Sequence, residues 1–268
     1  MIPLPKKPKV IEKDGNRAVI EVSELYPGFG ATIGNALRRA LYSSLPGAAV
    51  TLVKVDGVPH EFSTTDGILE DMIEISLNLK AIRLKLHGDE PQKITLNAKG
   101  EKDVKARDIE TPSQVEIINK DAHIATLTSK KSSLSMELTV EPGLGYVQVD
   151  AEEKEKKEIG VIRLDAVFTP VVKVNFETEN MRVGDRTDYN KLILDITTDG
   201  TINPEDAYAE AVKVLVAHFE GIGELEGTKK KKAPAKKKKT TTKSDKETSE
   251  KKSTAKKITT KEKADKDK

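Results

Sequence analysis

The chain of 268 residues contains no cysteine and no long uninterrupted apolar run. Without cysteine, neither disulfide bonds nor thiolate metal sites are available to it. No stretch approaches the ~20 apolar residues that a membrane-spanning helix needs, and residues 1–10 lack the apolar segment of a secretory signal. These absences indicate an intracellular protein, and we expect it in the cytoplasm.

Familiar catalytic and cofactor-binding motifs are also missing. The four histidines are scattered, without the HExxH spacing of a zinc site, at His60, His87, His123 and His218. There is no P-loop, and the glycines at positions 28, 30 and 34 follow a Gly-x-Gly-x-x-x-Gly spacing that differs from the dinucleotide fingerprint. We therefore expect no metal site, no cofactor and no catalytic residue in this chain.

Acidic side chains do not form an obvious catalytic cluster either. Glu70, Asp71 and Glu74 are expected to form an acidic edge on one helix. Helical carboxylates one turn apart are usually solvated, and a two-metal site would need carboxylates that converge on a rigid loop. We interpret this edge as a solvated surface.

Charge divides the chain into two unlike parts. Residues 228–268 carry 18 lysines against 6 acidic residues, a net charge of +12, whereas the whole chain carries +2. The first 227 residues are therefore acidic, with a net charge of −10. The tail has no aromatic residue and one large aliphatic residue, Ile258, so it cannot bury enough apolar area to offset the entropy of ordering. We expect residues 228–268 to be disordered.

Several short segments of the acidic part alternate between apolar and polar residues, as strands do. Such segments are residues 18–22, 51–55, 82–86, 162–166, 172–176 and 192–196. Asp56-Gly57 is a favourable hairpin turn, and the charged residues 152–158 are typical of a solvated, mobile loop. Helices interrupt the strands without a regular βαβ rhythm, which predicts an α+β fold.

Residues 28–44 predict a helix with two different faces. At about 100° per residue, one apolar stripe is formed by Ile33, Ala36, Leu37, Ala40 and Leu41. The other face carries Asn35, Arg38, Arg39 and Tyr42. Thr32 is the expected N-cap, and Pro46-Gly47 ends the helix. Taken alone, the pattern also fits an ordinary surface helix with solvated arginines.

A second long helix is predicted near the end of the acidic part. Asn203 is the expected N-cap, Pro204 occupies the first helical position, and two acidic residues follow in the first turn. Apolar residues then recur every three or four positions, at Tyr208, Ala211, Val212, Leu215, Phe219 and Ile222. Such a helix is either buried inside its own domain or part of a self-associating surface.

Three strings of the sequence resemble the α subunit of bacterial RNA polymerase. The first, residues 28–50, reads GFGATIGNALRRALYSSLPGAAV. The second comprises residues 55–64 and 70–80, and the third comprises residues 186–192 and 198–207. They occur in the family's order, and the resemblance extends from about Val10 to Leu225.

This resemblance implies a homodimer that serves as the platform on which the catalytic β and β′ subunits assemble. It implies a discontinuous dimerisation domain, residues 1–46 and 173–227, with a mixed, β-rich domain inserted at residues 47–172. The active site of the nucleotidyltransferase then lies in the partners, and this subunit is itself non-catalytic.

The matching strings also imply contact residues. The β-contacting positions fall on Arg39, Tyr42 and Glu74, and the β′-contacting lysine falls on Lys80. Arg39 suits the role because a guanidinium makes several directed hydrogen bonds, whereas Tyr42 departs from the aliphatic residue often found there. The dimer interface is expected to include Ile33, Leu37, Leu41, Tyr208, Val212, Leu215 and Phe219.

After Leu225 the sequence departs from the family. A typical α subunit continues into a compact C-terminal domain that binds DNA and activators, whereas this chain continues into its lysine-rich tail. The tail predicts either nonspecific contact with DNA phosphates or a solubilising appendage. Two other functions remain open: a nucleic-acid-binding protein that acts mainly through this tail, and a subunit of the archaeal or eukaryotic heterodimeric class.

Overall fold

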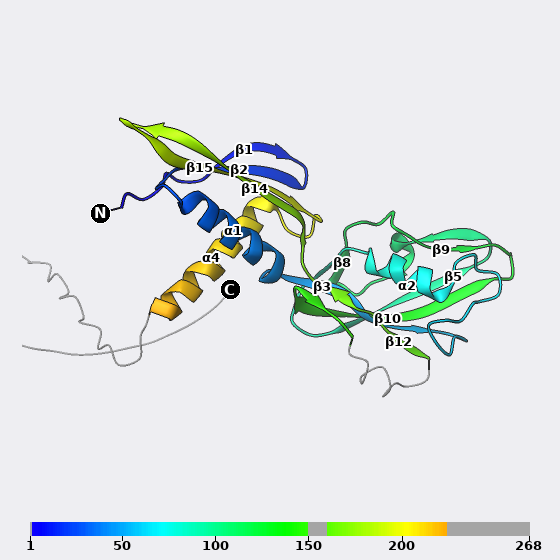
Figure 1. Ribbon diagram of the computed structural model, residues 1–268. Helices are drawn as coiled ribbons and strands as arrows, with labels where there is room; N and C mark the ends of the chain where they lie inside the picture. The colour runs from blue at the N-terminus through cyan, green and yellow to red at the C-terminus, as the bar shows by residue number, and fades with distance from the viewer. Residues whose placement is uncertain (1, 150–159, 224–268) are drawn as a thin grey trace, which may run out of the picture. The chain divides into compact units, whose positions relative to one another are not determined.

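A computed structural model describes residues 2–149 and 160–223 (Figure 1). These residues belong to one compact unit and combine helices with antiparallel sheets, so the predicted α+β class is confirmed. The helices are α1 (Phe29–Ser43), α2 (Met72–Lys80) and α4 (Pro204–Gly223), with a short 3₁₀ helix η1 (Ala106–Asp108). The lysine-rich tail and the charged loop at residues 152–158 lie outside the described residues.

One sheet has antiparallel strands in the order β1-β2-β15-β14. They are β1 (Lys9–Asp14), β2 (Arg17–Leu25), β14 (Val171–Val183) and β15 (Arg186–Thr198). The alternation predicted at residues 192–196 buries Leu192, Leu194 and Ile196 of β15. Figure 1 shows α1 and α4 on the same face of this sheet, and together the helices and strands enclose one hydrophobic core.

Helix α1 approaches this sheet closely through two glycines. A Cβ atom added to Gly34 would lie 2.5 Å from the Phe176 ring and 2.8 Å from Leu192. One added to Gly30 would overlap the Thr178 side chain. The spacing of these glycines in the sequence therefore serves close packing of a helix on a sheet.

The start of α1 differs from the prediction, and Thr32 is not the N-cap. Gly28 occupies the cap position with φ of 87°, and Thr32 Oγ1 only donates back to the Gly28 carbonyl at 3.3 Å. Asn190 of β15 supplies the acceptor instead: its Oδ1 accepts from the N–H groups of Gly28 at 2.9 Å and Gly30 at 3.4 Å. A residue distant in sequence thus satisfies amides at the beginning of the helix. Helix α4, in contrast, begins at Pro204 as predicted.

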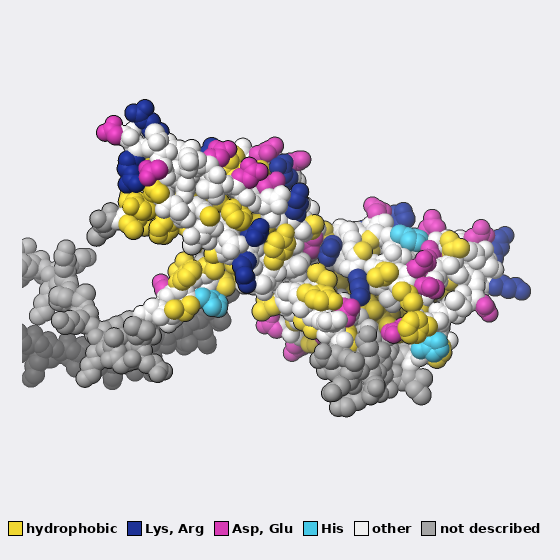
Figure 2. Space-filling model, in the orientation of Figure 1, with side chains coloured by type: hydrophobic (Ala, Val, Ile, Leu, Met, Phe, Trp, Pro, Cys, Tyr) yellow, Lys and Arg dark blue, Asp and Glu magenta, His cyan; other side chains and the backbone are white. Residues whose placement is uncertain are grey.

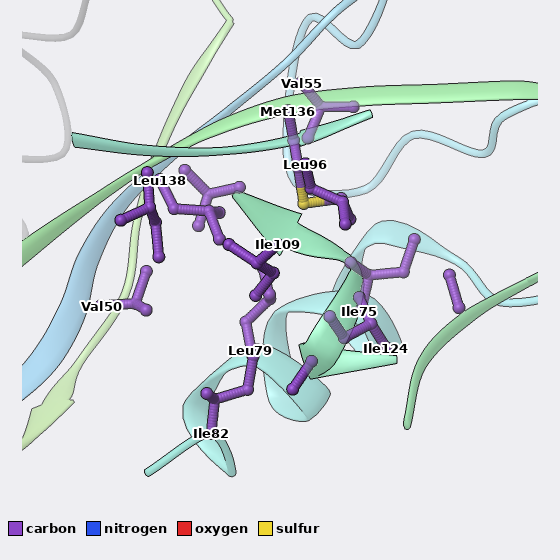
Figure 3. Packing of buried hydrophobic residues seen from close by; sticks show 14 of the residues in the cluster. Val50, Val55, Ile75, Leu79, Ile82, Leu96, Ile109, Ile124, Met136 and Leu138 are labelled. Atoms are coloured by element: carbon purple, nitrogen blue, oxygen red, sulfur yellow. The ribbon is translucent and has the colours of Figure 1, made fainter. Parts of the chain in front are cut away.

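The middle of the chain builds a second sheet, in the order β7-β5-β10-β3-β4-β8 with β12 also paired to β3. Its strands are β3 (Pro46–Val55), β4 (Leu84–Leu86), β5 (Gln92–Lys99), β7 (Ile109–Glu110), β8 (Val115–Ile117), β10 (Ser133–Leu144) and β12 (Val161–Arg163). Small sheets pair β6 (Lys102–Lys105) with β9 (His123–Leu127), and β11 (Tyr146–Val147) with β13 (Ala166–Val167). Figure 3 shows Ile75 and Leu79 of α2 in a core with Leu96 and Leu138, and this core shares no residue with the first.

Most predicted strands are confirmed, with three differences. The segment at residues 82–86 enters β4 only at Leu84, and the segment at 162–166 is divided between β12 and β13. Asp56-Gly57 forms a turn in which the Val58 N–H donates to the Val55 carbonyl at 3.3 Å, but no hairpin follows. Strand β3 already pairs with β10, β4 and β12, which come from later parts of the chain.

Candidate protein contact surfaces

The two halves of α4 are buried to very different degrees. Ala207 and Ala211 in the first half are fully buried in the core. In the second half, Phe219 is 65% exposed and Ile222 is 73% exposed. Figure 2 shows hydrophobic side chains at the surface along this helix. The alternative of a helix wholly buried inside its own domain is therefore wrong, because its second half presents an uncovered apolar face.

A groove of about 450 Å³ lies between this half of α4 and helix α1. We call it the α1–α4 groove. Its walls come from α1 and its C-cap (Thr32, Asn35, Ala36, Arg39, Ala40, Ser43, Ser44) and from α4 (Val214, Leu215, His218, Phe219, Ile222). A groove that combines exposed apolar side chains with polar ones is typical of a surface that receives another protein.

The residues expected at a dimer interface divide into two groups. Leu37 and Leu41 are fully buried in the core of their own chain, so they have no surface to offer a second copy and that prediction is wrong for them. Ile33, Tyr208, Val212 and Leu215 pack against the same core but remain partly exposed, and burial raises the pKa of Tyr208. Phe219 is the most exposed residue of the predicted set.

The two arginines of α1 have different surroundings. The Arg38 guanidinium lies 5.2 Å from the centre of the Phe176 ring and donates to Asn35 Oδ1 at 3.0 Å. Arg39 is exposed and lines the α1–α4 groove, as Phe219 does. Within residues 2–149 and 160–223, its guanidinium forms no hydrogen bond or ion pair. Arg39 is therefore available to a partner, whereas Arg38 is engaged by its own chain.

Tyr42, at the end of α1, is also engaged by its own chain. Its hydroxyl oxygen accepts a hydrogen bond at 2.8 Å from the Val174 N–H at the edge of the four-stranded sheet. The ring remains partly exposed. A partner can therefore contact the ring of Tyr42, but its hydroxyl already joins α1 to β14.

Helix α2 carries both of the other predicted contact residues. Glu74 is exposed, and its N–H donates at 2.7 Å to the N-cap residue Asp71. Lys80, in the last turn, is half-buried and forms an ion pair with Asp165 at 3.3 Å. Asp71 is thus a helix cap rather than a member of a solvated acidic edge.

The sequence interpretation missed an apolar surface beside Lys80. Phe62 is 72% exposed, Leu77 is 57% exposed, and Ile73 is exposed beside them. We call these three side chains the α2 patch; they line a groove of about 230 Å³ together with Lys80 and Asp165. The spacing of Ile73 and Leu77, one turn apart, was the available signal, but Ile75 and Leu79 show the same spacing and are buried. Only the fold distinguishes the two pairs.

Glu70 differs most from its predicted environment. It precedes the helix and is not solvated, since its side chain is 11% exposed. Its carboxylate accepts hydrogen bonds from the Thr126 N–H at 2.6 Å, from Thr126 Oγ1 at 3.0 Å and from His123 Nε2 at 2.8 Å. Burial raises the pKa of Glu70, but the bonds from Thr126 and His123 outweigh it, and the pKa is lowered overall.

The histidines occupy separate positions. His60 contacts Ser63, His87 lies near Glu116, and His218 Nδ1 donates to the Val214 carbonyl of its own helix. In the part of the chain that the structure describes, His, Asp and Glu side chains do not gather in threes as a metal site would require. None of the helices in residues 2–149 and 160–223 combines the length and apolarity needed to span a membrane.

Comparison with known proteins identifies the family. Residues 53–169 match the RNA polymerase Rpb3/RpoA insert domain. The chain is 47% identical over 219 residues to the DNA-directed RNA polymerase subunit alpha of Roseiflexus castenholzii, a match that covers 82% of this chain and 67% of that one. It is 48% identical to the subunit of Symbiobacterium thermophilum, over 80% of this chain and 69% of that one. The protein therefore belongs to the family of bacterial DNA-directed RNA polymerase α subunits.

Proposed function

We propose that two copies of this chain form the platform on which the β and β′ subunits of RNA polymerase assemble for transcription in the cytoplasm. In this proposal the chain itself holds no catalytic residue, and the nucleotidyltransferase active site lies in the partners. The observation that carries the proposal is family membership combined with two uncovered apolar surfaces, the second half of α4 and the α2 patch.

The dimer is proposed to form through the α1–α4 groove. In a symmetric dimer the same surface serves both copies, so Phe219 and Ile222 of each chain would enter the groove of the other. The dimerisation domain would comprise residues 1–46 and 173–227, with residues 47–172 inserted. The separate hydrophobic cores support this division, and so does the insert-domain match at residues 53–169.

The catalytic subunits are proposed to bind at residues that the resemblance assigns to them. Arg39, the ring of Tyr42 and Glu74 would contact β, and Lys80 would contact β′. Exposure of Arg39 and Glu74 supports their role. Lys80 already pairs with Asp165, so its contact with β′ would extend an existing ion pair.

The test of this function is capture of the large subunits by the full-length chain carrying Arg39→Ala. We expect its thermal stability to stay within about 0.5 kcal/mol of wild type, because Arg39 is exposed. Retention of β should fall, because truncating a buried interface arginine commonly costs about 2 kcal/mol or more.

Arg38→Ala is the matched control, because Arg38 is engaged by its own chain, and it should still retain β. Sedimentation of the same samples is needed to show whether the dimer is retained, because Arg39 also lines the α1–α4 groove, the proposed dimer interface. Normal β retention by Arg39→Ala would remove this residue from the interface. A chain that forms no homodimer alone would favour the heterodimeric class instead.

The lysine-rich tail suggests a second function, nonspecific binding to DNA. It lies outside the described residues, and the support is its net charge of +12 over residues 228–268. Each phosphate contact should contribute about −0.9 to the slope of log affinity against log salt. Deleting the tail should abolish binding and its salt dependence, and equal binding after deletion would leave only a solubilising role.

A further inference from the structure

The segment before α2 is attached to strand β9 as an additional strand would be. The Leu69 N–H donates to the Thr126 carbonyl at 3.0 Å, and the Thr128 N–H donates to the Gly67 carbonyl at 2.9 Å. Ile68 forms an isolated bridge with Leu127 between these bonds. The two-stranded sheet of β6 and β9 would otherwise leave this edge of β9 unpaired.

Glu70 completes this attachment at the point where the chain turns into α2. After Leu69, the main chain leaves the strand, and the Glu70 carboxylate takes over as the acceptor for the next free amide, Thr126 N–H, at 2.6 Å. The Thr126 hydroxyl and His123 donate to the same carboxylate. A nearly buried carboxylate that accepts from three donors is held in one orientation.

The helix is fixed to β9 at its other end as well. Asn78 Nδ2, in the last turn of α2, donates to the Ile124 carbonyl of β9 at 3.0 Å. At the first turn, Asp71 directly follows Glu70 and caps the helix. Glu70 and Asn78 therefore attach both ends of α2 to β9, and with the buried Ile75 and Leu79 they hold the rotation of the helix about its axis.

The rotation of α2 decides which apolar side chains reach the surface. Ile75 and Leu79 are buried, whereas Ile73 and Leu77 are exposed on the other face. Phe62 lies in the preceding loop, which is joined to the start of α2 by a hydrogen bond from the Met72 N–H to the Ser63 carbonyl at 3.3 Å. A looser attachment would separate Phe62 from the helical members of the α2 patch.

We propose that Glu70 is a positioning residue for partner binding: its carboxylate fixes α2 and the preceding loop so that the α2 patch and Glu74 form one rigid surface for the β subunit. The identity of the partner, the β subunit, rests on the proposed function. The attachment of α2 by Glu70 rests on the contacts of Glu70 alone. A surface that is already ordered binds more tightly, because less conformational entropy is lost on association.

The experiment compares Glu70→Ala with Glu70→Gln in the full-length chain. Alanine removes all three bonds, while glutamine keeps an acceptor for the Thr126 N–H and an amide group for the Thr126 hydroxyl or His123. In Glu70→Ala, hydrogen-exchange protection should fall about tenfold or more in Leu69 and α2 but stay unchanged in β5 and β10. Affinity for purified β should fall about tenfold, and Glu70→Gln should restore both to within about threefold of wild type.

Glu110→Ala is the matched control, because Glu110 is an exposed glutamate of β7, a strand of the larger sheet and not of the sheet formed by β6 and β9. If Glu70→Ala does not fold, His123→Ala tests the same point, since the exposed His123 supplies one of the three donors and its loss should give a smaller change in the same direction. Uniform loss of protection, or unchanged β binding with a loosened α2, would overturn the positioning role. If wild type and Glu110→Ala also fail to bind β, the proposed function itself is overturned.

Discussion

Phe219 offers the sharpest test of the proposed dimer, because the isolated chain leaves most of its ring uncovered. The side chain is 65% exposed, and a phenylalanine has roughly 200 Å² of surface, so about 130 Å² remains exposed in the monomer and can be buried in a dimer. At about 25 cal/mol per Å², covering this area contributes about 3 kcal/mol in each copy, and Phe219→Ala would remove about 2 kcal/mol of it. A symmetric dimer contains the residue twice, so the dissociation constant should rise about a thousandfold.

Sedimentation equilibrium of the full-length chain over a series of concentrations measures this change directly. Folding of the monomer should change by only about 1 kcal/mol, because little of the ring is buried within the chain. Lys213→Ala on the same helix is the control, since Lys213 is exposed and its loss should leave the dimer intact. A Phe219→Ala dimer as tight as wild type would refute the proposed interface, and loss of folded structure would show that the ring belongs to the core.

Two further outcomes can be measured on the same protein. Gly34→Ala should lower the thermal stability by about 1–3 kcal/mol, because the added methyl group would meet the Phe176 ring at 2.5 Å; unchanged melting would mean that α1 does not pack this closely. The lowered pKa of Glu70 means that its charged form adds stability above the pKa of the unfolded state, about 4.3. That stability is lost as the pH falls through the folded-state pKa. The melting temperature of wild type should therefore exceed that of Glu70→Gln by less below about pH 4 than above it. A difference in melting temperature that does not change with pH would contradict this reasoning.

The local sequence was sufficient to predict those structural features that depend on neighbouring residues. Pro204 and the acidic residues after it specify the start of α4, because the free amides and dipole of a helix end act within one turn. The alternation at residues 192–196 likewise specified a strand with one buried face. The start of α1 was predicted wrongly because its amides donate to Asn190. No local sequence pattern indicates a hydrogen-bond acceptor about 160 residues away.

The contact surfaces show the same limit more clearly. The family-like strings implied that Arg39, Glu74 and Lys80 contact the partner subunits. The sequence could not show which apolar residues of a helix are exposed in the folded chain. Leu37 and Phe219 look alike in a periodic pattern, yet the first is covered by its own sheet and the second is exposed.

The sequence alone therefore indicated the family, through three strings that resemble it, and it predicted the α+β class and the principal helices, which follow from short-range periodicity. Only the tertiary structure decided that Asn190 accepts hydrogen bonds from amides at the start of α1, that Glu70 is bonded to β9, and that Phe62, Ile73 and Leu77 form a surface patch. The physical reason is that burial depends on contacts between segments far apart in the chain. Glu70 and Thr126 are separated by 56 residues, and folding brings them within 2.6 Å.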